Sequence, residues 1–172
     1  MKEIKACICE GGAERIIIDK LLDNDKLIFN RDELLDNEVL KCRSAKQFEN
    51  RYLGKKFNSP IIVYRILDSH RENFTLSKMY KDKVEVINVV TAPEIEMLII
   101  INENKYNEYN KLKSKIKPSE FCKNNLKFHN VKSRDFVDKY FSDIDKLVRC
   151  INEYKRISNI RNNELCLADL LK

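Results

Sequence analysis

The stretch Ile4-Lys5-Ala6-Cys7-Ile8-Cys9-Glu10-Gly11-Gly12-Ala13-Glu14 decides the fold of this chain. It opens with a short apolar run that has no helical periodicity, which is typical of a buried strand. The run ends at the two glycines, and the residues beyond them are helical in pattern, since Ile17 and Leu21 lie four positions apart. The sequence therefore predicts a strand, a tight turn and a helix that ends near Asn24.

Strands and helices continue to alternate along the chain. The β-branched run at residues 61–67 is the clearest strand in the sequence, and a third strand is expected over residues 83–90. Pro93 then opens a helix over residues 94–102, because proline is tolerated in the first helical turn. Such alternation is the signature of a parallel sheet with crossover helices. We therefore predict an α/β fold with a small, mostly parallel sheet.

Weaker patterns predict the remaining elements. A short strand is expected at residues 27–29, a helix at 44–52 and a short helix at 74–80. From about residue 105 the pattern is only helical, with Ser119 and Ser133 as helix caps and a strongly amphipathic helix at 143–156. We place a boundary near Asn104, between an α/β domain at 1–104 and a helical extension at 105–172 that packs on the same domain.

The composition is that of a globular protein rather than a disordered one. Apolar residues make up 43% of the 172 positions and charged residues 35%, and the apolar residues occur in periodic runs. The 33 basic and 27 acidic residues give a net charge of +6. This basic excess permits binding to nucleic acid or another acidic surface, although it does not require it.

The six cysteines show neither a disulfide framework nor a zinc site. There is no CxxC pair and no Cys/His spacing typical of zinc ligands. No signal peptide precedes Lys2, and no apolar run is long enough to span a membrane. We therefore expect a cytoplasmic protein without a membrane partner, whose thiols are reduced and mostly buried. Cys7 and Cys9 should face the same side of their strand.

Acidic residues follow each of the three predicted strands. Glu10 ends the first, Asp68 and His70 end the second, and Glu96 lies at the start of the helix after the third. Ligands of an open parallel sheet bind beyond the carboxyl ends of its strands. Carboxylates and an imidazole that converge there would suit Mg²⁺ or Mn²⁺, which neutralises a phosphodiester and helps to activate water.

The glycine pair adds a phosphate-binding expectation. Gly11 and Gly12 allow a close backbone approach, and the helix N-terminus that follows offers free N–H groups. The turn is neither a dinucleotide fingerprint nor a phosphate loop, because it lacks the third glycine of one and the Gly-Lys-Ser/Thr end of the other. Glu10 and Glu14 would repel a phosphate unless a metal lay between them, so Glu14 is a further candidate ligand.

Each candidate has a structural alternative. Glu14 favours the helix dipole from the first turn whatever the function, and Asp68 is a good turn residue. His70 is equally compatible with an ordinary loop position. Glu96 would also fit an ion pair with a surface lysine or arginine.

Basic residues form a second group of candidates. Arg65, Arg71, Lys78 and Lys81 surround the end of the second strand, and we predict that the first three contact nucleic acid. Further lysines follow at positions 111, 113, 115 and 117, with Tyr106 and Tyr109 as candidates for stacking on bases. A solvated helix face is the alternative for any one of these lysines.

At the three acidic sites the sequence resembles the TOPRIM domains of topoisomerases, primases and the OLD and RloB-like defence nucleases. Residues 8–14 resemble the first TOPRIM motif, and residues 66–70 stand where that family has its Asp-x-Asp metal motif. Residues 92–100 resemble the Pro-x-x-Glu helix start of RloB-like proteins. The resemblance covers about residues 3–103 and departs from the pattern at His70, which replaces the second aspartate.

The resemblance implies a Rossmann-like sheet, Glu10 as a general acid/base or metal-facing acid, and Asp68 as a Mg²⁺ ligand. Histidine ligates Mn²⁺ better than Mg²⁺, so a changed metal, substitution by Glu72 and a degenerate site all stay open. The expected function is metal-dependent phosphodiester cleavage of DNA or RNA in bacterial or phage defence. The alternatives are a non-catalytic nucleic-acid or protein-interaction module and a small-molecule phosphotransferase. A partner protein or a homo-oligomer is compatible with each.

Overall fold

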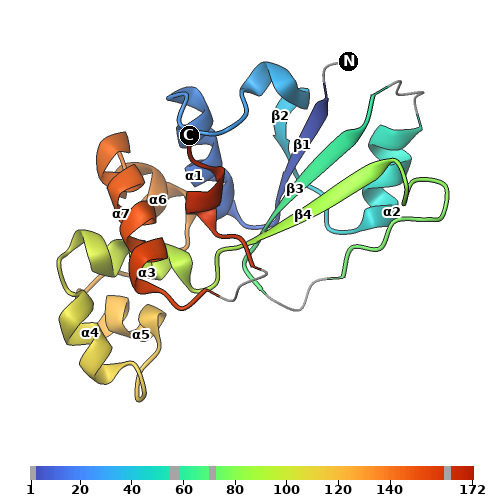
Figure 1. Ribbon diagram of the computed structural model, residues 1–172. Coiled ribbons are helices and arrows are strands. Elements are labelled where there is room, and N and C mark those ends of the chain that lie inside the picture. Colours follow the sequence, from blue (N-terminus) through green and yellow to red (C-terminus); the bar gives the residue numbers. More distant parts are fainter. Residues whose placement is uncertain (1–2, 55–58, 70–72, 161–163) are drawn as a thin grey trace.

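The centre of the molecule is a four-stranded parallel sheet with the strand order β2-β1-β3-β4 (Figure 1). It is seen in a computed structural model that describes residues 3–54, 59–69, 73–160 and 164–172. The strands are β1 (Ile4–Cys9), β2 (Leu34–Leu40), β3 (Ile61–Leu67) and β4 (Val84–Val90). The predicted α/β fold with a small parallel sheet is confirmed.

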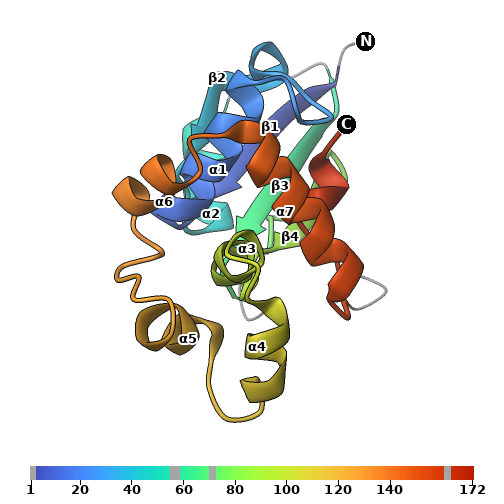
Figure 2. The ribbon, with the colours of Figure 1, turned by 90° about the vertical axis from the view of Figure 1, so that its left-hand side faces the viewer.

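Helices cover both faces of the sheet, and two of them extend away from it (Figures 1 and 2). The first face is covered by α1 (Gly12–Asp23), α3 (Glu94–Asn102), α6 (Arg134–Tyr140) and α7 (Ile144–Ile157). The second face is covered by α2 (Ala45–Phe48) and the π-helical turn η2 (Glu49–Leu53). The remaining elements are α4 (Tyr106–Leu112), α5 (Pro118–Asn124) and the short 3-10 helices η1 (Arg31–Glu33) and η3 (Leu167–Leu170).

The inner strand β1 is apolar from Ala6 to Cys9 because both of its faces are covered there. Cys7 and Cys9 pack into the core on the α1 side, as predicted from their spacing. Ala6 and Ile8 alternate with them and pack into the smaller core on the α2 side. This double burial explains why the strand reads as a continuous apolar run.

Strand β2 lies where no strand was predicted. The expected strand at 27–29 is wrong, since Leu27 forms only an isolated antiparallel bridge with Leu171. The real strand contains Asp36 and Asn37 in the left-handed backbone region, with φ of 55° and 56°. The register of β1 against β2 shifts at the same place. This bulge breaks the alternation of apolar residues on which a sequence pattern depends.

The predicted helix at 74–80 is also wrong, because this segment is an extended stretch followed by turns. Its anchors are an aromatic contact and a side-chain bond. The rings of Phe74 and Phe48 have centroids 6.0 Å apart, and the Ser77 N–H donates to Glu49 Oε1 at 2.5 Å. The segment therefore covers the second face of the sheet beside α2 without forming a helix.

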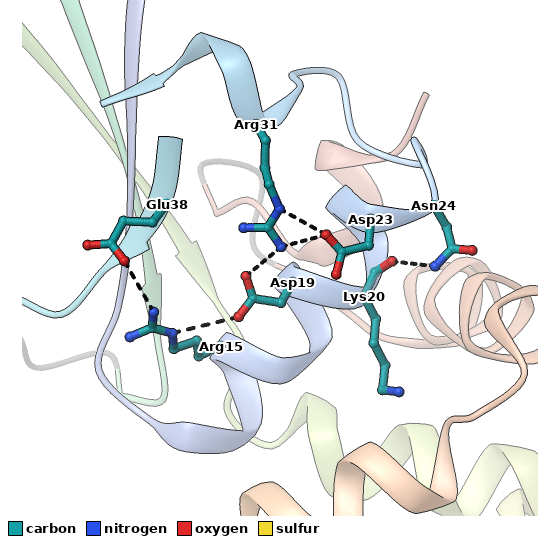
Figure 3. Close-up of polar contacts among 7 residues, drawn as sticks. All are labelled: Arg15, Asp19, Lys20, Asp23, Asn24, Arg31 and Glu38. Carbon is teal, nitrogen blue, oxygen red and sulfur yellow. Dashed lines mark hydrogen bonds and ion pairs between the residues drawn. The ribbon is translucent and has the colours of Figure 1, made fainter. Parts of the chain in front are cut away.

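An ion-pair network ties the connection between α1 and β2 to the outer side of α1 (Figure 3). Arg31 Nη2 lies 2.9 Å from Asp19 Oδ1 and 2.7 Å from Asp23 Oδ1. Arg15 lies 3.7 Å from Asp19 and 3.8 Å from Glu38. Partly exposed pairs of this kind add little stability singly, so the network chiefly fixes where β2 begins and ends.

The helices after residue 105 do not form a separate core. Leu147, Cys150 and Ile151 of α7 belong to the same apolar cluster as α1 and α3. The chain then returns to the sheet, where the Val90 N–H donates to the Leu165 carbonyl at 2.8 Å. The C-terminal segment, residues 164–172, thus runs from the edge of β4 back to the end of α1.

Two of the predicted caps have different outcomes. Ser133 caps α6, since its side chain accepts a bond from the Phe136 N–H at 3.2 Å. Ser119 does not cap α5, which starts one residue earlier at Pro118 with Lys117 before it.

Within the described ranges, no helix combines the length and apolar character needed to cross a bilayer.

Candidate functional site

The carboxyl ends of β1 and β3 form a topological switch point. The chain leaves β1 towards β2 across the face that carries α1, and it leaves β3 towards β4 across the opposite face, where Phe74 and Leu76 pack. The neighbouring strands therefore connect in opposite directions, and in open α/β sheets ligands bind at this place. Glu10 and Asp68 directly follow these two strands.

A pocket of about 350 Å³ opens at this switch point, lined by Glu10, Gly11, Arg43 and Asp68. The structure thus brings together three of the residues that the sequence singled out. Arg43 was not predicted. It follows β2, so recognition of that strand would have drawn attention to it. The end of each of three adjacent strands contributes one charged side chain to the pocket.

The buried Arg65 forms an ion pair with Glu10. Its side chain is 2% exposed, and its Nη2 lies 3.5 Å from Glu10 Oε1. A second guanidinium nitrogen donates to Asn88 Oδ1 at 3.4 Å, and the guanidinium carbon lies 4.4 Å from the centre of the Phe74 ring. The prediction that Arg65 contacts nucleic acid is wrong, because a guanidinium enclosed by protein does not reach an external polyanion. Within the site, the Arg65 guanidinium instead positions the Glu10 carboxylate.

Glu14 folds back over the turn. A Cβ atom added to Gly11 would lie 1.8 Å from Glu14 Oε2, so the carboxylate occupies the space that any side chain at position 11 would need. Glu14 is 3% exposed. Burial raises its pKa, and the negative charges of Asp68 and Glu96 raise it further, against a bond from its own backbone N–H and the charge of Lys132. The Glu14 carboxylate therefore lies against Gly11 just beneath the pocket, and its pKa depends on the charges of Asp68 and Glu96.

Glu96 is another buried acid of this group. It is 4% exposed, and its Oε1 lies 3.4 Å from Lys132 Nζ, which is the ion pair with a surface lysine that the sequence left open. Its Oε2 has no hydrogen-bond partner among the described residues. A buried carboxylate oxygen without a partner is costly for the fold, and it is also a strong acceptor for any donor that reaches it.

Of the remaining predicted site residues, some lie away from the pocket and others are not among the described residues. Gly12 is the first residue of α1 and faces α6, where an added Cβ would lie 3.6 Å from Arg134 Cβ. Lys78 is exposed in the turns that precede β4. His70 and Arg71, together with Glu72, lie outside the described residues, so the expectations attached to them stay predictions.

The acids of the pocket fit a hydrated divalent cation better than a closed protein cage. In the described part of the chain, no three His, Cys, Asp or Glu residues stand close enough to hold one ion together. Mg²⁺, however, keeps several waters and is commonly held by one or two carboxylates. Glu10 and Asp68 supply two such carboxylates to one pocket.

A third buried acid, Glu94, was not singled out by the sequence. Glu94, at the start of α3, is completely buried. Its Oε2 accepts from the Leu167 N–H at 3.4 Å, while its Oε1 has no partner within the described residues. Burial raises its pKa to about 8. The available signal was its position, since Glu94 opens a helix that is otherwise almost wholly apolar.

Comparison of the chain with family models, with curated proteins and with solved structures gave no match in any of the three. The function must therefore be argued from the pocket and from the sequence motifs.

Proposed function

We propose that this chain is a metal-dependent phosphodiester-cleaving enzyme that acts on nucleic acid, a TOPRIM-like nuclease of bacterial or phage defence. The observation that carries the proposal is the pocket in which Glu10 and Asp68 meet Arg43 and Gly11 at the switch point of the sheet. Two carboxylates beside an exposed guanidinium suit a phosphodiester and a divalent cation together. The resemblance of residues 8–14 and 66–70 to TOPRIM motifs points the same way.

The side chains have separable tasks. Glu10 and Asp68 would hold Mg²⁺ or Mn²⁺, which supplies charge neutralisation and an activated water when bound. Arg43 binds a phosphate oxygen of the substrate through its guanidinium. Arg65 fixes the position of the Glu10 carboxylate through the 3.5 Å ion pair. Gly11, which has no side chain, leaves room for the Glu14 carboxylate beside the pocket.

The test combines metal binding with cleavage. Mn²⁺ binding is measured by calorimetry, and cleavage is measured with labelled single-stranded and duplex DNA and RNA. We expect Glu10→Gln and Asp68→Asn to weaken metal binding and to lower the cleavage rate by at least about 100-fold. Glu85→Gln is the matched control, because Glu85 is an exposed carboxylate near the amino end of β4 and should change neither quantity.

Two results would refute the proposal. One is the absence of Mn²⁺ and Mg²⁺ binding at millimolar concentration. The other is cleavage by Glu10→Gln at the wild-type rate. The first result with oligonucleotide binding intact would favour a non-catalytic nucleic-acid-binding module, whereas the second would show that cleavage does not depend on Glu10.

A further inference from the structure

The net positive charge of this protein comes from one segment. Residues 105–132 hold eight of the 33 basic residues but only two of the 27 acidic ones. This segment therefore carries +6, which equals the net charge of the whole chain, and the other residues are balanced at 25 of each sign. The lysines are Lys105, Lys111, Lys113, Lys115, Lys117, Lys123, Lys127 and Lys132, and the acids are Glu108 and Glu120.

Most of these lysines form no ion pair with a described residue. Lys105 pairs with Glu108, and Lys132 pairs with Glu96. The other six are exposed, and no ion pair with a described residue involves them. Like charges held so close raise the local potential and attract polyanions.

The segment is placed beside the candidate site. Its helices α4 and α5 project beyond the carboxyl end of the sheet while packing on α3, and we call this segment the α4–α5 arm (residues 105–132; Figures 1 and 2). The last lysine of the arm, Lys132, contacts Glu96 beneath the pocket. A polyanion that lies along the arm would therefore be led towards Glu10 and Asp68.

An aromatic pocket opens at the base of the arm. It measures about 390 Å³, and its lining includes Tyr106 and Tyr109 of α4, Tyr154 of α7, Met97 of α3 and Lys113, together with residues 157–160 and 164–166. This volume lies within the range of small-ligand pockets, about 300–1,000 Å³. Tyrosine rings are surfaces on which bases stack, and Lys113 brings a cation to the same opening.

We propose that the α4–α5 arm binds single-stranded nucleic acid, with phosphates on its lysines and one base in the tyrosine pocket. A duplex keeps its bases inside the stack and would have to pay for extruding one, whereas a single strand presents its bases freely. An anionic membrane would satisfy the lysines but offers no aromatic ring for the pocket. The inference rests on the proposed function in taking nucleic acid as the substrate, and it adds the strand form and the binding surface.

The lysines are tested by charge reversal in the full chain. Fluorescence anisotropy with a labelled single strand of about 20 nucleotides, long enough for one binding site, is recorded in EDTA over a range of salt concentrations. We expect Lys115→Glu with Lys117→Glu to weaken binding at low salt at least about tenfold and to reduce the slope of log K against log salt by about 1.4. The control, Lys81→Glu with Lys83→Glu, makes the same change of charge at the amino end of β4 and should stay within about twofold of the wild type.

The pocket is tested at Tyr106, which is half-buried. Tyr106→Ala removes the ring and should weaken single-strand binding about tenfold, while Tyr106→Phe keeps the ring and should bind like the wild type. Neither change should affect binding of the duplex. Thermal unfolding of each variant separates a lost contact from a lost fold.

The inference is overturned if duplex and single strand bind equally well, or if reversal at Lys115 and Lys117 has no more effect than the control. Because these measurements contain no metal, they stand apart from the cleavage test. Wild-type binding that depends on the arm, together with no metal binding, would refute the nuclease and keep the arm. Metal-dependent cleavage without arm-dependent binding would do the reverse.

Discussion

The carboxyl edge of the sheet and the α4–α5 arm handle charge in opposite ways. At the edge, Glu14, Glu94 and Glu96 are buried and depend on specific neighbours. On the arm, most lysines face solvent without an ion-pair partner among the described residues. A buried charge influences folding strongly because water cannot replace its partners, whereas an exposed charge contributes little to stability. Substitutions at the edge should therefore change stability, and substitutions on the arm should change binding.

The largest effect is expected at Glu94. Its pKa in the folded chain is about 8, compared with 4.5 as its ordinary value, so the folded chain holds a proton that the unfolded chain releases between these pH values. Its contribution to stability is full below about pH 4.5 and falls as the pH rises to about 8. At about 1.4 kcal/mol per pKa unit, the full loss approaches about 5 kcal/mol.

The measurement is the free energy of urea unfolding at pH 5 and pH 8, for the wild type and for Glu94→Gln. The glutamine cannot ionise, so we expect the variant to lack most of the decline with pH. Other acids titrate in both proteins and cancel in the difference. An equal decline in both proteins would contradict a buried, protonated Glu94.

A smaller effect is expected when Arg65 is replaced. Arg65→Gln leaves Glu10 without its cation and removes the guanidinium from the Phe74 ring. Loss of one partner of a buried pair costs about 3–5 kcal/mol, and the 16% exposure of the Glu10 side chain reduces our expectation to about 2–3 kcal/mol. Lys115→Gln on the arm removes one positive charge as well and should change stability by less than about 0.5 kcal/mol. Urea unfolding of both variants measures these losses. Similar losses of stability for Arg65→Gln and Lys115→Gln would contradict the contrast between the edge and the arm.

The smallest effect concerns the two glycines of the turn. Gly11→Ala must displace the Glu14 carboxylate, which lies 1.8 Å from the new Cβ, at a cost of about 1 kcal/mol. Gly12→Ala meets its nearest neighbour at 3.6 Å and stands in a helix, where alanine is favoured over glycine, so it should be neutral or slightly stabilising. Thermal unfolding of both variants tests this.

A double variant sharpens the test of Gly11. In a Glu14→Ala background the space over Gly11 is empty, so Gly11→Ala should lose its penalty there. If the penalty persisted without Glu14, the backbone rather than the buried carboxylate would be what requires glycine.

Local patterns were sufficient for much of the fold. The apolar runs of β1, β3 and β4, the periodicity of α1 and α7, and Pro93 before α3 predicted these elements to within a few residues, because double burial and amphipathic packing leave clear signals in the sequence. Strand β2 was missed because its bulge at Asp36 and Asn37 interrupts the alternation. The helix expected at 74–80 failed because contacts of Phe74 and Ser77 with α2 and η2 replaced local helical bonds.

The site was predictable only in part for the same reason. Strand ends pointed to Glu10 and Asp68, which share a pocket. Arg43 was missed together with β2. The burial of Arg65 and the pairing of Glu96 with Lys132 depend on side-chain packing across distant segments. Charge counting alone made Arg65 look like a surface cation, since a local window does not show which face of a doubly covered strand is closed.

Because all six cysteines are buried, the rate at which each one is alkylated would report the local unfolding of the structure around it. Thiol reagents attack the thiolate, and burial raises the pKa of Cys122 and Cys166 to about 12. The native protein should therefore be almost inert to alkylation, and each cysteine should react only when its own part of the structure opens. Since these thiols extend from Cys7 in the central strand to Cys166 beside η3, the order of their labelling would rank the parts of the molecule by how readily they unfold.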